Sequence, residues 1–373
     1  MPTRTAPSKP PVAAGPPERR HRGAAERVLA RMSMRQRVGQ LFMVGTPATR
    51  PSRETRSQIR AYHVGNVILT GRSRRGIRAV SRVVAVMQRQ TTPSATARVP
   101  LLVATDQEGG AVQVLQGRGL SRIPAALDQG RWSLQRLSRR AGRWASQLRR
   151  VGVNMNLAPV LDTVPGPRAA RHNAPIGAYR REYGFRTGTV ARHGAAFERA
   201  MARHGVAPTA KHFPGLGRVR RNTDYSAGVT DRTTRRHDPY LVPFRKVIRA
   251  GVPFVMVSTA DYQHLDPGHL AAFSGFVIRT MLRHDLGFRG VVVSDDLAIA
   301  RQVARWRYGQ RAVKFIRAGG DLVLASSPQA LPAMYHAVLY RARHNRAFRA
   351  KVDHAALLIL RAKQRQHLLG GTR

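Results

Sequence analysis

The chain has 373 residues, of which 42% are hydrophobic, and it contains no cysteine. This composition excludes disulfides, thiolate nucleophiles and cysteine-based metal sites, and no stretch approaches the roughly 18 apolar residues that cross a bilayer. The 65 basic residues against 19 acidic ones give a formal net charge of +46, which ordinarily indicates a polyanionic partner.

The basic residues are nearly all arginine and are scattered along the chain, for example over residues 72–84 and 139–150. Scatter of this kind favours a compositional bias over a binding footprint. We therefore expect non-specific attraction to anionic polymers and no specific nucleic-acid binding.

Residues 1–23 are rich in proline and arginine and have hardly any large apolar side chain. Such a segment cannot bury enough surface to offset chain entropy, so we predict a disordered tail before one domain over residues 24–373. The tail has no apolar run typical of a signal peptide. This favours a cytoplasmic location, or export if the true start lies upstream.

Eight short apolar runs recur along the chain, and each is followed by a stretch typical of a helix. The runs cover residues 38–46, 65–70, 101–107, 154–162, 206–213, 254–260, 290–296 and 321–327. Nearly continuous apolar runs indicate parallel strands that are covered on both faces. The pattern predicts a single (β/α)8 TIM-type barrel, although counting alone leaves an open doubly wound sheet as an alternative.

Helices are predicted in the connections, and glycines such as Gly152 and Gly205 indicate where two of them end. The predicted helices cover residues 52–62, 75–90, 132–150, 188–204, 239–250, 274–285 and 300–318. Residues 330–369 predict two or three more helices, which form the last barrel helix and a helical C-terminal extension. No second domain and no internal repeat are indicated.

Polar side chains gather where four of the predicted strands end. They are Asp106, Gln107 and Glu108, then Asp162, then Lys211 and His212, and finally Ser294, Asp295 and Asp296. The carboxyl ends of the strands form the active-site face of a barrel, so these residues predict a ligand site. We expect Asp296 to cap a helix beginning at Leu297, a role that does not account for Asp295.

Lys211 is the only lysine between Lys9 and Lys246, in a chain that otherwise uses arginine. A compact ammonium is not interchangeable with a guanidinium at a tight contact, so its use here indicates a specific role. An isolated histidine would favour a structural interpretation, but His212 stands next to Lys211, and we expect it to contact the ligand. No metal-binding or phosphate-binding motif is present, and we predict no metal and no cofactor.

Four motifs in this order resemble glycoside hydrolase family 3, and in particular its bacterial β-N-acetylglucosaminidases. They are residues 106–110 (DQEGG), 156–162 (NLAPVLD), 211–215 (KHFPG) and 294–297 (SDDL). The resemblance implies a retaining hydrolase that releases terminal N-acetyl-β-D-glucosamine, with Asp295 as the nucleophile. It also implies that Asp106, Arg181, Lys211 and His212 bind the sugar hydroxyls.

The loop after the third motif departs from the family pattern. Relatives carry an Asp-Ser-His segment whose histidine and aspartate act as acid/base, whereas this chain has Asn222, Thr223 and Asp224 there. Asp224 is the natural substitute, although Arg218, Arg220 and Arg221 would lower its pKa. The alternative for Asp224 is an Asx-turn or a pairing with a neighbouring arginine.

Two smaller departures lie near the predicted site. Ala111 stands where relatives often have arginine, and Arg180 stands where an acid commonly precedes Arg181. Both changes could alter contacts with the substrate.

Three other functions remain open at this level. One is a sugar-binding barrel with impaired catalysis, and another is a β-glucosidase or xylosidase activity of the same family. The third is a binder of anionic polymers, whose affinity would fall steeply with salt. A combined hypothesis has an arginine-rich surface that holds the enzyme near cell-wall polymers while the barrel cleaves peptidoglycan-derived glycans.

Overall fold

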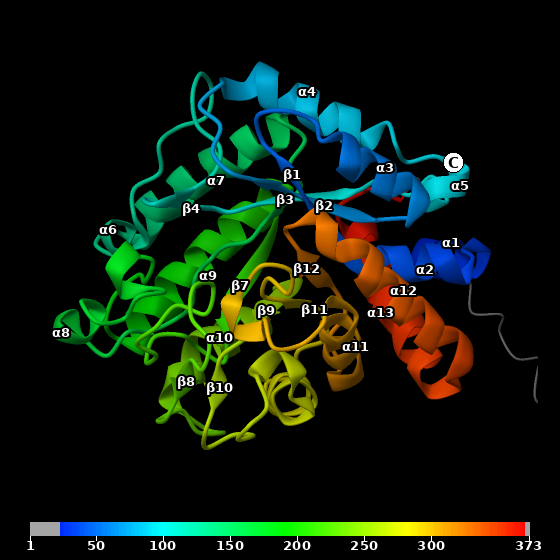
Figure 1. Cartoon of the computed structure of the whole chain (residues 1–373). Helices are drawn as coiled ribbons and strands as arrows, with labels where there is room; N and C mark the ends of the chain where they lie inside the picture. Colours follow the sequence, from blue (N-terminus) through cyan, green and yellow to red (C-terminus); the bar gives the residue numbers. More distant parts are fainter. Residues whose placement is uncertain (1–22, 370–373) are drawn as a thin grey trace, which may run out of the picture.

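The computed structural model describes residues 23–369 (Figure 1). The predicted disorder of residues 1–23 therefore concerns residues outside the described part, except Gly23, which precedes the first helix. No helix among the described residues has the length and apolar character that spanning a membrane requires.

Eight parallel strands form the central sheet, in the order β11-β9-β7-β6-β3-β2-β1-β12. Their bounds are β1 (Phe42–Pro47), β2 (Asn66–Thr70), β3 (Leu102–Thr105), β6 (Met155–Asn156), β7 (Ala207–Phe213), β9 (Phe254–Val257), β11 (Val291–Ser294) and β12 (Val323–Ala325). A parallel bridge between Val293 and Leu322 brings the two ends of this order together. The sheet is thus a nearly closed barrel, which confirms the predicted fold and not the open sheet.

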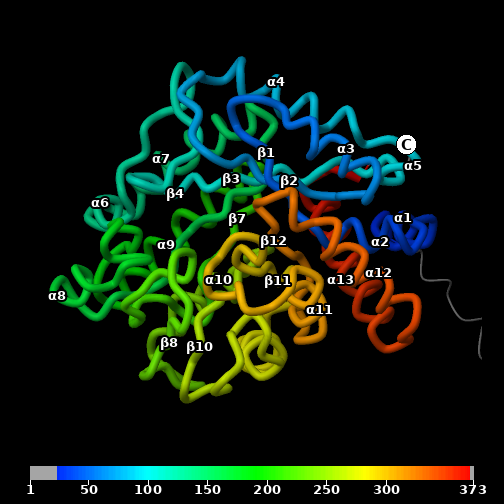
Figure 2. Tube along the Cα trace, viewed as in Figure 1, coloured from blue at the N-terminus to red at the C-terminus, as the bar shows by residue number. Residues whose placement is uncertain are grey.

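Helices surround the barrel and follow its strands in turn, as the trace in Figure 2 shows. They are α3 (Arg53–Ala61), α4 (Gly76–Gln88), α7 (Leu134–Arg150), α9 (Thr187–Arg203), α10 (Val242–Arg249), the π-helix η4 (Phe276–Asp285), α11 (Tyr308–Ala318) and α12 (Leu331–His344). In α7 the buried residues Leu137, Ala141, Trp144 and Leu148 recur every three or four positions. This spacing turns one stripe toward the sheet and leaves most of the arginines of α7 facing outward.

Shorter elements lie in the loops and between the barrel helices. The short helices and strands are α5 (Pro93–Thr96), β4 (Gln107–Gly109), β5 (Val112–Gln113), α6 (Ala126–Gln129), α8 (Pro167–Ala170), β8 (Thr230–Asp231) and β10 (Asp261–Tyr262). The 3-10 turns are η1 (Gly177–Tyr179), η2 (Pro239–Leu241), η3 (Ala271–Phe273), η5 (Arg301–Val303) and η6 (Pro328–Ala330). Three of these loop elements, β4, β5 and η1, follow strands at the face where the polar side chains gather.

The first predicted strand begins too early, because the observed strand β1 begins at Phe42. Residues 38–40 of the prediction belong to α2 (Met34–Gln40), which begins with a capping box. The Ser33 hydroxyl accepts the Gln36 amide at 3.2 Å, and the Gln36 side chain accepts the Ser33 amide at 3.0 Å. This reciprocal pair marks a helix start that the apolar pattern alone concealed.

Two other boundaries also differ from the predictions. The fourth strand is continuous only over Met155–Asn156, and further along Val160 forms an isolated parallel bridge with Lys211. The helix predicted from residue 300 begins at Tyr308, after the 3-10 turn η5.

The C-terminal extension is confirmed as α13 (Arg346–Arg365), which packs against α1 (Ala24–Arg31) and α2. Figure 1 shows this contact between the red and blue ends of the chain. The two ends of the domain therefore hold each other at one side of the barrel.

Lys363 of α13 is fully buried in this region. Its Nζ donates to Gln40 Oε1 at 2.8 Å and to the Gly65 carbonyl at 2.7 Å, and no carboxylate of residues 23–369 pairs with it. Burial lowers the pKa of Lys363 well below its usual value. A neutral amine has two N–H donors, which matches the two acceptors present.

We expect Lys363 to make stability rise with pH. Between the lowered pKa of the folded chain and about pH 10, the unfolded chain binds a proton at this lysine that the folded chain lacks, so within this window the unfolding free energy rises by at most about 1.4 kcal/mol per pH unit. Lys363→Met should remove this contribution, as measured by urea unfolding from about pH 7 to 10. Lys351→Met, on the same helix but half-buried, is the control. Parallel stability curves for wild type and Lys363→Met would contradict the prediction.

Candidate active site

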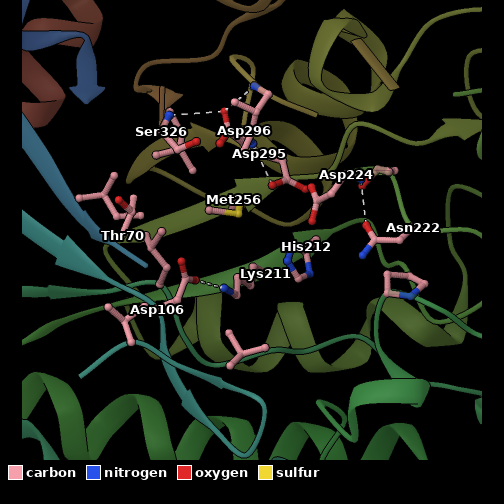
Figure 3. A pocket seen from close by; sticks show the side chains of 18 of the residues that line it. Thr70, Asp106, Lys211, His212, Asn222, Asp224, Met256, Asp295, Asp296 and Ser326 are labelled. Carbon is pink, nitrogen blue, oxygen red and sulfur yellow. Dashed lines mark hydrogen bonds and ion pairs between the residues drawn. The ribbon is translucent and has the colours of Figure 1, made fainter. Parts of the chain in front are cut away.

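A cavity of about 520 Å³ opens at the carboxyl ends of the barrel strands. The six residues that the family resemblance assigns to catalysis or sugar binding all line this cavity, namely Asp106, Arg181, Lys211, His212, Asp224 and Asp295. Five of them are labelled in Figure 3. They come from the ends of β3, β7 and β11 and from the loops after β6 and β7, so the barrel joins segments that are far apart in the sequence.

A network of buried charges forms one side of the cavity. Lys211 Nζ lies 2.6 Å from Asp106 Oδ1 and 2.6 Å from Glu108 Oε1. Arg181 binds the same Glu108 carboxylate with two hydrogen bonds, at 2.8 and 2.7 Å. Glu108 thus pairs with two cations, Lys211 and Arg181. Lys211 also pairs with Asp106.

The protonation of this network follows from its geometry. Burial alone would raise the pKa of Glu108, but Arg181 and Lys211 outweigh it and lower that pKa to about 2. Burial opposes the charge of Lys211, yet Asp106 and Glu108 raise its pKa. Both side chains are therefore charged at neutral pH, which suits the binding of sugar hydroxyls.

Glu108 is the residue whose role sequence reasoning missed, although it lies in the same motif as Asp106. We expect Glu108→Gln to lower the unfolding free energy by about 3 kcal/mol, because it leaves two buried cations with one carboxylate fewer. Glu26→Gln is the matched control, since Glu26 pairs with Arg361 near the surface and should cost less than about 1 kcal/mol. Denaturant unfolding measures both, and equal losses would contradict the interpretation.

His212 is held by a fully buried carboxylate. Its Nδ1 lies 2.7 Å from Asp162 Oδ2, and the other oxygen of Asp162 accepts the Leu216 amide at 2.7 Å. The His212 Nε2 faces the Arg181 guanidinium at 3.4 Å, which can only donate. The Nδ1 therefore carries the proton and donates it to Asp162, while Nε2 is the acceptor at the cavity.

Asp224 and Asp295 lie near each other on the other side of the cavity, as Figure 3 shows. Desolvation by the surrounding protein and the charge of Asp295 raise the pKa of Asp224 to about 6, although its side chain remains accessible from the cavity. Asp295 follows β11 directly, and its Oδ1 accepts the Asp296 amide at 2.9 Å. The site thus contains two carboxyl groups with different surroundings, an arrangement that separates acid from nucleophile.

The expected lowering of the Asp224 pKa by the loop arginines is wrong. Arg218 turns away to Asp238, at 2.6 Å, and stacks on the Tyr240 ring. Arg221 donates to the Gly228 carbonyl at 2.9 Å. Both guanidinium groups are thus engaged by other partners, and desolvation and the charge of Asp295 raise the pKa of Asp224.

The Asx-turn expected in this loop is present, but Asn222 forms it. The Asn222 side chain accepts the Asp224 amide at 2.9 Å, and the Asp224 carboxyl has no hydrogen-bond partner within the described part of the chain. The loop is also tied to the β11 side, since the Asp224 and Thr223 carbonyls accept the amides of Arg301 and Gln302, both at 3.0 Å. Asp224 is therefore held in place by its main chain while its side chain faces the cavity.

Asp296 does not cap a helix at Leu297 as expected. Its Oδ1 accepts the amides of Ala298 and Ile299, at 2.8 and 3.3 Å, within a turn. The carboxylate thereby fixes the loop that follows Asp295.

Ala111 and Arg180, the two other residues that differ from the family pattern, each contact a nearby residue. The carbonyl of Ala111 accepts Arg72 Nη2 at 2.9 Å, and both residues line the cavity. Arg180 pairs with Asp128 near the surface.

In residues 23–369, no group of three or more histidine and acidic side chains could hold a metal ion.

The protein-family model of the glycosyl hydrolase family 3 N-terminal domain matches residues 33–362 of this chain. The chain belongs to glycosyl hydrolase family 3. Membership of this family makes it a glycosidase that hydrolyses O-glycosyl bonds.

Similar proteins of this family span most of the chain. A β-hexosaminidase from Thioalkalivibrio sulfidiphilus is 34% identical, over 76% of this chain and 79% of its own length. One from Stenotrophomonas maltophilia is 32% identical, over 85% and 92%. The crystal structure of a β-N-acetylhexosaminidase from Beutenbergia cavernae shares 49% identity with a TM-score of 0.88, over 89% of this chain and 99% of that one.

Proposed function

We propose that this glycosyl hydrolase family 3 chain is a retaining β-N-acetylhexosaminidase that releases terminal non-reducing N-acetyl-β-D-glucosamine. The observation that carries the proposal is the pair Asp224 and Asp295 in one cavity, with the pKa of Asp224 raised to about 6. The relatives named β-hexosaminidase support the choice of sugar.

In the first step, the Asp295 carboxylate attacks the anomeric carbon while the bond to the leaving oxygen breaks. Asp224 gives its proton to that oxygen, so the aglycone leaves as a neutral alcohol. Asp295 is then esterified to the sugar, and Asp224 is ionised.

In the second step, the ionised Asp224 takes a proton from water as the water oxygen attacks the same carbon. The ester bond to Asp295 breaks, and the sugar leaves with its original anomeric configuration. A pKa of about 6 lets Asp224 exchange this proton near neutral pH.

The charged side of the cavity holds the sugar in this scheme. Asp106 and Lys211 offer an acceptor and a donor for hydroxyl groups, and His212 Nε2 offers another acceptor. We also propose that the glycans derive from peptidoglycan. The net charge of +46 supports this source, because cationic surfaces attract the anionic polymers of a cell wall.

The test is hydrolysis of the aryl β-glycosides of N-acetylglucosamine, glucose and xylose by the purified protein. We expect cleavage of the N-acetylglucosaminide with retention of configuration, which proton NMR of the first product detects. Preferred cleavage of the glucoside or xyloside would replace the proposed sugar. If no substrate turns over while N-acetylglucosamine still binds, the chain is a sugar-binding barrel without catalysis.

A further inference from the structure

A second cavity, of about 710 Å³, lies outside the active site and shares no lining residue with it. Its walls come from the loop after β6, which includes α8, from residues 217–220 of the loop after β7, and from Thr233 and Tyr240. Figure 1 shows α8 at the periphery of the molecule. We call this space the α8 cavity. Its volume falls in the range of about 300 to 1,000 Å³ that is typical of small-molecule sites.

All the charged residues that line the α8 cavity are basic. Arg168, Arg218 and Arg220 line it together with His172, and no aspartate or glutamate does. Arg218 pairs with Asp238 at 2.6 Å. Arg168 and Arg220 are exposed, and neither side chain has a hydrogen-bond or ion-pair partner in the described part of the chain. Unlike the arginines along the outer helices, these two border a cavity, where both can contact one anionic ligand.

The two main loops of the α8 cavity are joined by hydrogen bonds. The buried Asn173 side chain donates to the carbonyls of Leu216 and Val219, at 2.8 and 2.7 Å. The Ala174 amide donates to the Arg220 carbonyl at 3.0 Å. The Arg220 side chain therefore extends from a fixed main chain. A site whose frame is ordered before binding loses less entropy when a ligand docks.

The chemistry of the walls suits a phosphate monoester. Near neutral pH its phosphoryl group carries about two negative charges and has three terminal oxygens, so it can pair with Arg168 and Arg220 at once. Thr233 adds a hydroxyl donor. Pro165 and Val219 give the cavity an apolar wall, against which the carbon skeleton of an ester can lie. A lone inorganic anion would leave that wall without a contact.

We infer that the α8 cavity binds a small phosphate monoester, of about the size of a pentose phosphate. Arg168 and Arg220 hold the phosphoryl group from the two loops. One of these loops lines both cavities, since residues 217–220 border the α8 cavity and residues 222–224 border the active site. A ligand in the α8 cavity therefore contacts the loop that carries Asp224 without entering the active site.

The test is isothermal titration calorimetry with ribose 5-phosphate, ribose and inorganic phosphate. The ionic strength is held constant with chloride, because a protein of charge +46 attracts every anion. We expect one saturable site for ribose 5-phosphate, tighter than for inorganic phosphate, and no binding of ribose. Arg168→Ala and Arg220→Ala should each weaken binding about tenfold, since each removes a charge-assisted contact. Arg82→Ala is the control, because it removes one exposed charge on α4 and does not line the cavity.

Asp295→Asn separates this inference from the proposed function. Under that function it abolishes hydrolysis, but it should bind ribose 5-phosphate as wild type does, so either proposal can fail alone. If no saturable site is found, or Arg82→Ala weakens binding as much as Arg220→Ala, the net charge attracts the anion and the inference is overturned. Binding that neither Arg168→Ala nor Arg220→Ala weakens would also overturn it. Equal affinities for the ester and inorganic phosphate would contradict the assignment of an ester ligand.

Discussion

Asp295→Asn is expected to reduce kcat for aryl N-acetylglucosaminide hydrolysis by at least about 1000-fold, because an amide cannot form the glycosyl ester. The side chain keeps its size, and its carbonyl oxygen can still accept the Asp296 amide. The fold should therefore persist, which circular dichroism and thermal unfolding check. The loss in rate then reflects the missing nucleophile and not a loss of the fold.

The control for this change is Asp353→Asn. Asp353 lies in α13, pairs with Arg37 at 3.0 Å and does not line the active-site cavity. It should retain activity within about twofold, since partly exposed ion pairs contribute little. A comparable loss in both variants would show that the Asp295 effect is not specific to the cavity.

Added azide distinguishes a nucleophile from a positioning residue. Asp295→Gly opens space beside the anomeric carbon, and azide can attack there in place of the carboxylate. With an activated aryl leaving group, the product would be the glycosyl azide of inverted configuration, with the phenolate released. Recovery without inversion, or no recovery in any condition, would argue against Asp295 as the nucleophile.

The second large effect is expected at Asp224. For the methyl glycoside, Asp224→Asn should reduce kcat/KM by about 100-fold to 10,000-fold, the usual contribution of general acid catalysis. A dinitrophenyl leaving group needs no proton, so the first step should be nearly unaffected with that substrate. The size of the loss should thus depend on the basicity of the leaving group.

The pH profile gives an independent test of Asp224. Burial and the charge of Asp295 raise the pKa of Asp224 to about 6, and acid catalysis requires its protonated form, which predominates below that value. The kcat/KM of wild type should therefore fall tenfold per pH unit above about pH 6. Asp224→Asn should lose this alkaline limb. If the limb persists in the variant, another group is the acid.

The structure explains why the sequence predicted some site residues and missed others. Asp106, Lys211 and Asp295 stand at the ends of apolar runs, so a strand assignment alone placed them on one face of a barrel. The role of Glu108 depends on Arg181, which is 73 residues away in the chain. A pattern of neighbouring residues cannot indicate a pairing between positions so far apart in the chain.

The sequence by itself determined the eight strands, most of the helices and the face of the barrel that carries the site, because apolar periodicity and strand ends are local properties of the chain. Only the tertiary structure decided the protonation of Asp224, since this depends on Asp295 and on where Arg218 and Arg221 turn. Electrostatic and packing interactions act through space, and their outcome is set by which segments the fold brings together.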